Sequence, residues 1–285
     1  MLIVDFSNLV FMEVHQFFRA TGIQPKNEND IRNLLINALM EIKKKFSKYG
    51  DMVIAVDGKH YWRKDIFPYY KAKRKIARDK SEIDWDAFFP VLEKIKEEIA
   101  ENFPAKMVCV ENAEADDIIA ILASRFGSNE NVCIWSSDSD ILQVQNFAPK
   151  VKQYSPFKRR FITPKSEEYN LFEHIVRGDS GDGVPNILSE EDIFVQEVRK
   201  KQKAITKSML EKWSLSGIND YKTFCTDENM QKRFEQNRLL IDFFMIPKEV
   251  ADAIVEKFQN AKEPKGKIFG YLVKYRMTKL LANGV

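Results

Sequence analysis

Short apolar runs alternate along this chain with longer segments in which apolar residues recur at helical spacing. The runs at 2–4, 52–56, 106–110 and 132–135 predict strands, and the segments 31–46, 88–99 and 115–126 predict helices. This alternation predicts an α/β fold with a mostly parallel central sheet flanked by helices. Right-handed crossovers bring the carboxyl ends of parallel strands to one edge, which is where ligands usually bind in such sheets.

The pattern changes after about residue 182, where helical and charged segments dominate. The segments 200–215, 229–244 and 247–258 predict helices, and they favour a smaller C-terminal helical domain. A basic group at Lys152, Lys158, Arg159 and Arg160 falls where a hairpin is expected.

Acidic residues gather where the predicted strands end. Three strands are followed by an acid, a further group opens the helix at 115–126, and two more lie in the turn RGDSGDG. The full set is Asp5, Asp57, Glu114, Asp116, Asp117, Asp138, Asp140, Asp179 and Asp182. Singly, most of these acids have structural explanations, because carboxylates favour first helical turns, N-caps and Gly-containing turns. Asp5 and Asp57 are harder to explain that way, since each directly ends an apolar strand.

Taken together, the acids indicate a metal site. Like charges that converge on one sheet edge repel each other, and a bound cation relieves that repulsion. Oxygen ligands select hard cations, so we expect Mg²⁺, two ions, with Mn²⁺ able to substitute. Two such ions can activate water and stabilise the leaving oxygen in phosphodiester hydrolysis.

A basic and aromatic segment follows Asp57 directly. Between Lys59 and Lys80 basic residues far outnumber acids, and Tyr61, Trp62, Phe67, Tyr69 and Tyr70 are interleaved with them. Basic side chains bind phosphates and aromatic rings stack on bases, which is typical of single-strand binding. A solvated charged helix is the alternative, but such a helix usually mixes signs. For the second basic stretch, 199–207, binding of duplex phosphates and a solvated charged helix are equally good interpretations.

Composition narrows the class of protein. The 285 residues are 44% hydrophobic and 31% charged, a soluble globular profile. No stretch approaches the ~20 apolar residues of a membrane span, and the N-terminus resembles a strand more than a secretion signal. Three dispersed cysteines, Cys109, Cys133 and Cys225, indicate a reducing compartment without a zinc motif. The histidines form no local metal pattern.

The motifs LIVDFSN, VDGKHYWRKDIFPYYKAKR, AEADD, SSDSD and RGDSGDG, in this order, resemble the 5′-nuclease (flap endonuclease) superfamily. The likeness is greatest to the ribonuclease H branch of T-even bacteriophages, and VKQYSPFKRRF, RLLIDFFMIP and GKIFGYLVK extend it over nearly the whole chain. It implies a PIN-like catalytic domain at 1–182, with a helical arch or flexible loop at 59–84, and a duplex-binding helical domain at 183–285.

The resemblance also implies an activity. The enzyme would be a metal-dependent 5′→3′ exonuclease and flap endonuclease that acts on DNA and on RNA/DNA hybrids and leaves 5′-phosphates. Its setting would be removal of RNA primers during lagging-strand phage DNA replication, in the cytoplasm of an infected bacterial host. Duplexes with 5′ ends or flaps are the expected partners, with a single-strand-binding protein and a sliding clamp as further candidates and a monomer as the expected state.

The resemblance assigns roles to particular residues. The nine acids match the metal-site acids, with Asp138 also expected to be catalytic, and Lys71 and Arg74 match a basic pair near the scissile phosphate. Tyr70 matches an aromatic that stacks on the terminal base. The remaining expected nucleic-acid contacts are Arg63, Lys64, Lys73, Arg78, Arg199, Lys200, Lys201 and Lys203.

Two departures modify these expectations. The stretch 183–189 (GVPNILS) has fewer glycines than the family's helix–three-turn–helix, so potassium binding is not expected there and duplex binding shifts to 199–207. The chain begins almost at its first strand, so a clamp contact through an N-terminal extension is not expected.

Two other functions remain open. A non-catalytic module that binds nucleic-acid junctions would account for the basic segments but leaves the acids unexplained. A PIN-type single-strand ribonuclease would share the acidic core but rarely needs a large basic arch.

Overall fold

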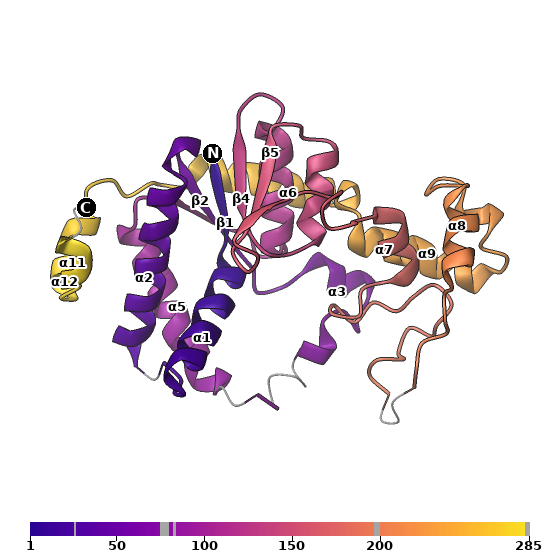
Figure 1. The fold of residues 1–285 in the computed structure, drawn as a ribbon, viewed down its shortest axis with the longest axis horizontal. Helices are drawn as coiled ribbons and strands as arrows, with labels where there is room; N and C mark the ends of the chain where they lie inside the picture. Colours follow the sequence, from indigo (N-terminus) through magenta and orange to yellow (C-terminus); the bar gives the residue numbers. More distant parts are fainter. Residues whose placement is uncertain (26, 75–79, 82–83, 197–199, 283–285) are drawn as a thin grey trace. The chain divides into compact units, whose positions relative to one another are not determined.

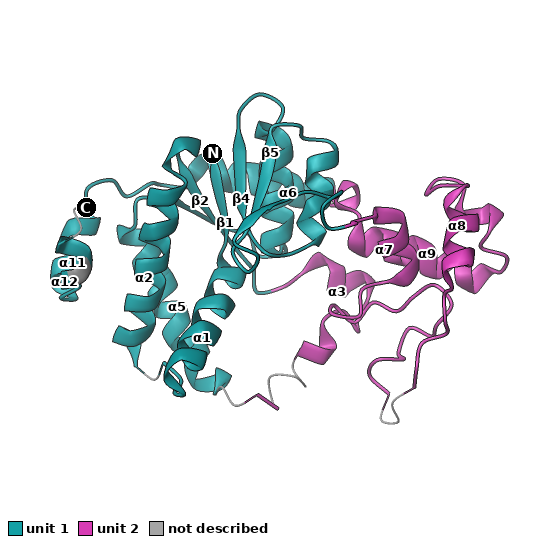
Figure 2. Ribbon diagram, viewed as in Figure 1, with its two compact units in different colours: residues 1–59, 83–167, 248–285 teal, residues 60–82, 168–247 magenta. Residues whose placement is uncertain are grey.

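The structure is a computed structural model that describes residues 1–25, 27–74, 80–81, 84–196 and 200–282. It divides into two compact units (Figure 2). Unit 1 comprises Met1–Lys59, Ile83–Glu167 and Lys248–Val285, and unit 2 comprises His60–Glu82 and Glu168–Pro247. Two residues expected to contact nucleic acid, Arg78 and Arg199, lie outside the described residues.

Unit 1 contains a six-stranded sheet in the order β3-β2-β1-β4-β5-β6. Its strands are β1 (Leu2–Asp5), β2 (Met52–Val56), β3 (Lys106–Cys109), β4 (Val132–Trp135), β5 (Val151–Ser155) and β6 (Arg160–Ile162). The pairs among β1 to β5 are parallel, and only β6 is antiparallel, as the hairpin partner of β5. The mostly parallel sheet expected from the sequence is therefore confirmed. The carboxyl ends of β1, β2 and β4, with the acids that follow them, share one edge.

Helices cover both faces of this sheet (Figure 1). The helical elements of unit 1 are α1 (Phe6–Thr21), α2 (Glu28–Lys45), η1 (Ser47–Tyr49), α5 (Trp85–Asn102), α6 (Ala115–Phe126), η2 (Asp140–Asn146), α10 (Lys248–Asn260), α11 (Ile268–Lys274) and α12 (Thr278–Ala282). One core joins α1, α2, α5, α11 and α12 to alternate residues of the strands, such as Leu2 and Val4. The intervening residues, such as Ile3, are buried on the face that α6 covers.

The strands are apolar on both faces because both faces are covered. Leu2, Ile3 and Val4 are 1%, 0% and 0% exposed, and β2 and β4 are buried throughout. Full burial of such a side chain stabilises the fold by about 1.5–3 kcal/mol. A sheet stabilised in this way can hold polar side chains rigidly at its edge.

Unit 2 is helical. Its elements include α3 (Trp62–Ile66), α7 (Leu171–Arg177), α8 (Lys207–Ser214), η3 (Tyr221–Thr223), α9 (Glu228–Ile241) and η4 (Phe243–Met245). They share a core that includes Phe67 and Tyr70 from the segment after β2 and Phe234 from α9. The helical C-terminal region expected from the sequence is confirmed. In the part of the chain that the structure describes, no helix is long and apolar enough to cross a membrane.

The expected helix at 200–215 was wrong in its first half, because α8 begins only at Lys207. Thr206 caps α8 by accepting a hydrogen bond from the Met209 amide. The backbone ahead of it is used elsewhere: the Lys203 amide donates to Ser189 Oγ at 2.9 Å, and Asn186 Nδ2 donates to the Lys203 carbonyl at 2.8 Å. Residues 200–205 accordingly form neither helix nor strand.

The compact units divide the chain differently from the expected domains 1–182 and 183–285. Helix α10 belongs to unit 1, where Lys106 Nζ of β3 donates to the Phe258 carbonyl and the rings of Phe126 and Phe258 lie 5.4 Å apart. Helix α11 is joined to α2 and α5 through Glu98, which accepts hydrogen bonds from Arg32 and Tyr271. The chain therefore returns to the sheet after forming unit 2.

Candidate active site

Strand β1 ends directly in the first candidate residue. Asp5 is both the last residue of β1 and the N-cap of α1, where its Oδ1 accepts a hydrogen bond from the Asn8 amide at 3.0 Å. Because no loop separates the strand from the helix, the Asp5 carboxylate is fixed at the sheet edge. It is 5% exposed, so its charge is largely desolvated.

Asp57 follows β2 and connects that strand to α6. Its Oδ1 accepts a hydrogen bond from the Ala115 amide at 2.8 Å, and its Oδ2 accepts one from Ser7 Oγ at 2.5 Å. Gly58 comes next, and a Cβ there would lie 2.2 Å from the Val110 carbonyl oxygen. Only glycine allows the chain to leave Asp57 so close to the end of β3.

The first turn of α6 contains three of the predicted acids. Glu114 and Asp117 form a capping box in which the Glu114 amide donates to Asp117 Oδ2 at 3.0 Å, and both are almost completely buried. Asp116 lies between them and is half-buried. Glu114 and Asp117 therefore do have a structural role in the first turn of α6, as capping residues, and this role is compatible with metal binding.

The loop after β4 carries Asp138 and Asp140. Asp138 Oδ1 accepts a hydrogen bond from the Asp140 amide at 2.8 Å, and both residues are half-buried. The Asp138 amide donates to Ser136 Oγ at 3.1 Å, and Ser136 Oγ donates to Asp5 Oδ2 at 2.8 Å. Hydrogen bonds therefore link the loop after β4 to the end of β1.

Seven of the nine predicted acids thus lie on unit 1, and we call them the acidic edge: Asp5, Asp57, Glu114, Asp116, Asp117, Asp138 and Asp140. Burial raises the pKa of Asp5 to about 7, and the charges of Asp57 and Asp138 add to that rise against the hydrogen bonds from Asn8 and Ser136. Closely placed carboxylates fit a hard divalent cation. The residues present therefore suit such a cation.

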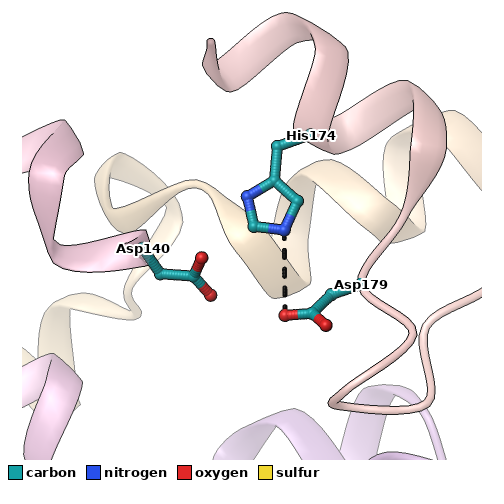
Figure 3. A group of neighbouring side chains, drawn as sticks. All are labelled: Asp140, His174 and Asp179. Atoms are coloured by element: carbon teal, nitrogen blue, oxygen red, sulfur yellow. Dashed lines mark ion pairs between the residues drawn. The ribbon is translucent and has the colours of Figure 1, made fainter. Parts of the chain in front are cut away.

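The other two acids belong to unit 2. Asp179 Oδ1 accepts hydrogen bonds from the amides of Gly181 at 2.7 Å and Asp182 at 3.2 Å, and its Oδ2 lies 3.7 Å from His174 Nε2 (Figure 3). Burial opposes ionisation of Asp179, but His174 and these amides outweigh it and lower its pKa to about 2. Sequence reasoning missed His174, whose spacing of five residues from Asp179 was the available signal.

Asp182 is surrounded by the residues expected near the scissile phosphate. Its Oδ1 accepts from Arg74 Nη2 at 2.6 Å, and its Oδ2 lies 2.8 Å from Tyr70 Oη and 3.4 Å from Lys71 Nζ. The Lys71 amide also donates to the Asp182 carbonyl at 2.7 Å. We call this group the Asp182 clasp. In this group the backbone of Lys71 has φ 58°, a left-handed conformation that residues other than glycine rarely adopt.

Gly183 makes room for this clasp. It has φ +78°, and a Cβ there would lie 3.2 Å from the Tyr69 carbonyl oxygen. Tyr70 itself is 4% exposed, so its expected stacking on a terminal base would require the ring to leave this position.

The remaining predicted contacts differ in how accessible they are. Arg63 is 2% exposed, and its Nε donates a hydrogen bond to the Leu240 carbonyl at 2.8 Å. In this position its side chain is not accessible to a nucleic acid. Lys73 is half-buried with its Nζ 3.3 Å from the centre of the Phe194 ring. Among the members that the structure describes, the exposed ones are Lys64, Lys200, Lys201 and Lys203.

Sequence reasoning also missed the residues that hold the acids. Gln153, from β5, is 0% exposed and donates from Nε2 to the Ser136 carbonyl at 3.1 Å and the Asp138 carbonyl at 2.6 Å. The Ser137 amide donates to Asn8 Oδ1 at 3.3 Å. The polar residues of SSDSD and of FSN were the available signal, but their partners depend on the order of the strands.

Comparison with known proteins agrees with this fold and site. Residues 1–172 match the family described as 5′-3′ exonuclease, N-terminal resolvase-like domain, and residues 165–284 match the family described as T4 RNase H, C terminal. The chain belongs to the 5′-3′ exonuclease family and is an enzyme of the 5′-nuclease class. The resemblance inferred from the motifs is therefore confirmed.

Individual relatives are consistent with this membership. Ribonuclease H of Enterobacteria phage T4 is 31% identical over 262 residues, which cover 89% of this chain and 85% of that protein. Flap endonuclease Xni of Shewanella sediminis is 30% identical over 198 residues, covering 65% of this chain and 70% of that one. Among solved structures, the T5 5′-exonuclease with zinc ions bound superposes with a TM-score of 0.65 at 18% identity, covering 91% of this chain and 98% of that one. A bacteriophage T5 flap endonuclease in complex with DNA and metal ions gives a TM-score of 0.63 at 19% identity, covering 91% of this chain and 99% of that one.

Proposed function

We propose that this enzyme is a Mg²⁺-dependent 5′→3′ exonuclease and flap endonuclease that acts on DNA and on RNA/DNA hybrids. The observation that supports it most directly is the acidic edge, where the ends of adjacent strands hold Asp5, Asp57 and Asp138 near one another. A fold keeps such mutually repelling carboxylates when they hold a cation. The names of the relatives support the choice of a nucleic acid with a free 5′ end or flap.

In this proposal the carboxylates of the acidic edge hold divalent cations, with Asp179 and Asp182 of unit 2 as further candidate ligands. Two bound ions would supply an activated water and stabilise the departing 3′-oxygen, so the protein needs no nucleophile of its own. The products would carry 5′-phosphates. Because Asp5 is buried, water solvates its charge poorly, so a bound cation is the favoured way to neutralise it.

Lys71 and Arg74 would stabilise negative charge on the scissile phosphate. Both are now paired with Asp182, so they already lie beside a candidate metal ligand. A phosphate would compete with the Asp182 carboxylate for the same cationic groups. If the phosphate replaced the Asp182 carboxylate as the partner of Lys71 and Arg74, substrate binding would be coupled to the position of Asp182.

The remaining parts of the proposal concern nucleic-acid binding and setting. Residues 1–182 would form the catalytic domain and 183–285 the duplex-binding domain, with the segment 59–84 receiving the 5′ single strand and the exposed lysines 200, 201 and 203 contacting duplex phosphates. The biological role would be primer removal on the lagging strand in the cytoplasm of a phage-infected cell. A single-strand-binding protein and a sliding clamp would be its partners, and the enzyme would act as a monomer.

The test is an assay on a 5′-labelled DNA flap and on an RNA/DNA hybrid, in Mg²⁺ and in EDTA. We expect Asp138→Asn to lower the rate by more than about a hundredfold, because it removes one charge from the acidic edge. Glu101→Gln, an exposed acid on α5, is the matched control and should keep the wild-type rate. Equal cleavage in EDTA, or full activity of Asp138→Asn, would show that the proposed mechanism is wrong.

The same assay separates the two alternative functions. Tight binding to flaps with no cleavage in Mg²⁺ or Mn²⁺ would identify a non-catalytic junction-binding module. Cleavage confined to single-stranded RNA would identify a PIN-type ribonuclease.

A further inference from the structure

A large cleft of about 1020 Å³ lies in unit 1 between α1, α2 and the β5–β6 hairpin. Asn8 and Ser137 line it, and these two residues are hydrogen-bonded to each other and adjoin the acidic edge. The cleft therefore opens beside the carboxylates proposed to hold the cation. It has no role in the mechanism described above.

Two carboxylates line this cleft without a protein partner among the described residues. Glu13 on α1 and Glu41 on α2 both line it, and within the described residues neither forms an ion pair or a side-chain hydrogen bond. Burial, together with the charge of Glu41, raises the pKa of Glu13 to about 7. Glu13 is half-buried and Glu41 is exposed. A half-buried acceptor that lacks a donor is costly, so Glu13 favours a ligand that brings N–H groups, and Glu41 adds a second acceptor beside it.

The cationic groups of the cleft do not fill this need. Lys45 Nζ donates to Tyr154 Oη at 2.7 Å and lies 4.3 Å from the centre of that ring. Arg19 and Arg159 also line the cleft and are exposed, but in the described part of the chain neither is paired with Glu13 or Glu41. Their charges attract a polyanion to the cleft, while the two glutamates disfavour a phosphate next to them.

An exposed aromatic side chain stands at one wall. Phe157, in the hairpin, is 76% exposed, and its amide donates to Ser137 Oγ at 3.1 Å. The hydroxyl of Ser155 lies 3.1 Å from the same oxygen. A ring held to the loop after β4 yet open to solvent contributes little to the core, but it is able to stack on a base.

We infer that this cleft binds one unpaired base of the substrate, with Phe157 against the face of the base and Glu13 and Glu41 accepting from its N–H groups. This inference rests on the proposed function. Guanine presents a ring N–H beside an amino group, which matches a carboxylate acceptor, whereas thymine and uracil present one N–H between two carbonyls. The cleft is therefore specific for bases rich in donors, with guanine preferred over thymine.

The test uses flaps that carry 2-aminopurine at one position each, on either side of the branch, mixed with the full-length enzyme in EDTA. A dye at a distant end reports binding by anisotropy, so 2-aminopurine fluorescence is compared at equal occupancy. We expect a fluorescence change at one position, reduced in both Phe157→Ala and Glu13→Gln. Phe269→Ala and Glu101→Gln, which remove an exposed ring and an exposed acid elsewhere in unit 1, should leave it unchanged.

The second measurement is cleavage in Mg²⁺ with guanine or thymine at the responding position. We expect kcat/KM to be about tenfold higher with guanine, and this preference to disappear in Glu13→Gln.

Binding without a fluorescence change at any position, or a change unaffected by both substitutions, overturns the inference. So does a response that needs Mg²⁺ and disappears in Glu13→Gln, because the glutamates would then hold a cation. Cleavage of unmodified flaps at the normal rate would show that the proposed function stands even if this inference fails.

Discussion

Ser136 donates a hydrogen bond from Oγ to Asp5 Oδ2 at 2.8 Å, and the same oxygen accepts the Asp138 amide at 3.1 Å. One buried hydroxyl therefore connects the carboxylate that ends β1 to the loop that follows the adjacent strand β4. Residues that orient metal ligands commonly change metal affinity or activity 10–100-fold when replaced. Ser136 occupies such a place without being a candidate ligand itself.

Ser136→Ala should lower nuclease activity about 10–100-fold and raise the Mg²⁺ concentration needed for half-maximal rate. The substitution leaves the buried Asp5 carboxylate without one donor, which should also cost about 1–3 kcal/mol in the free energy of unfolding. Activity titrated against Mg²⁺, together with urea unfolding, measures both effects. Ser124→Ala, which removes a hydroxyl bonded to the Ala120 carbonyl within α6, is the control and should keep the wild-type Mg²⁺ dependence. An unchanged Mg²⁺ dependence in Ser136→Ala would contradict this role.

Gln153→Met should weaken apparent Mg²⁺ binding while it keeps the volume of the buried side chain. The Gln153 amide supports the backbone of the loop after β4, the active-site loop, through the carbonyls of Ser136 and Asp138, and these acceptors would be left buried without their donor. Calorimetric titration with Mg²⁺ measures the affinity independently of cleavage. Gln145→Met is the matched control, because Gln145 Nε2 donates to the Ile162 carbonyl, outside the active-site loop. Equal affinities for the two variants would rule out a positioning role for Gln153.

The sequence predicted the acids of this site better than the residues that support them. An acid directly after an apolar run, as at Asp5 and Asp57, is placed at the carboxyl edge of the sheet as soon as the run is interpreted as a strand. The bonds of Ser136 and Gln153 depend on β4 lying between β1 and β5, and strand order is not visible in hydrophobic periodicity. Periodicity likewise cannot show that Arg63 is buried against the Leu240 carbonyl.

Lys71 offers a way to separate backbone strain from charge in the Asp182 clasp. Its φ of 58° suits glycine, so Lys71→Gly should be about 1 kcal/mol more stable than Lys71→Ala, although both remove the same ammonium group. Urea unfolding of the two variants measures the difference. Ala72→Gly, one residue later and without a positive φ, should instead destabilise the protein. If Lys71→Gly is the less stable of the two Lys71 variants, the left-handed backbone does not persist in solution.

Glu13 should make stability fall as pH rises from about 4.5 to about 7. Its pKa is raised from 4.5 to about 7 by burial and by Glu41, so across this window the folded state binds more protons than the unfolded state. Glu13→Gln should remove this dependence and leave the protein more stable than wild type at pH 8, by about 1 kcal/mol after allowance for solvent screening. Unfolding midpoints in urea at pH 5 and pH 8 measure the effect, with Glu101→Gln as the exposed control. Parallel pH profiles for wild type and Glu13→Gln would contradict the raised pKa.

Mg²⁺ should raise the melting temperature, because bound cations relieve the repulsion among the carboxylates of the acidic edge. Binding to the folded state alone stabilises by about 2.7 kcal/mol at a hundred times the dissociation constant. Calorimetric melting at millimolar Mg²⁺, compared with NaCl of equal ionic strength, separates specific binding from screening. Asp57→Asn should melt higher than wild type without Mg²⁺, since it removes one of the charges that raise the pKa of Asp5, and should gain less when Mg²⁺ is added. Equal gains in Mg²⁺ and in NaCl would mean that the acidic edge is a structural cluster and that the proposed cation site lies elsewhere.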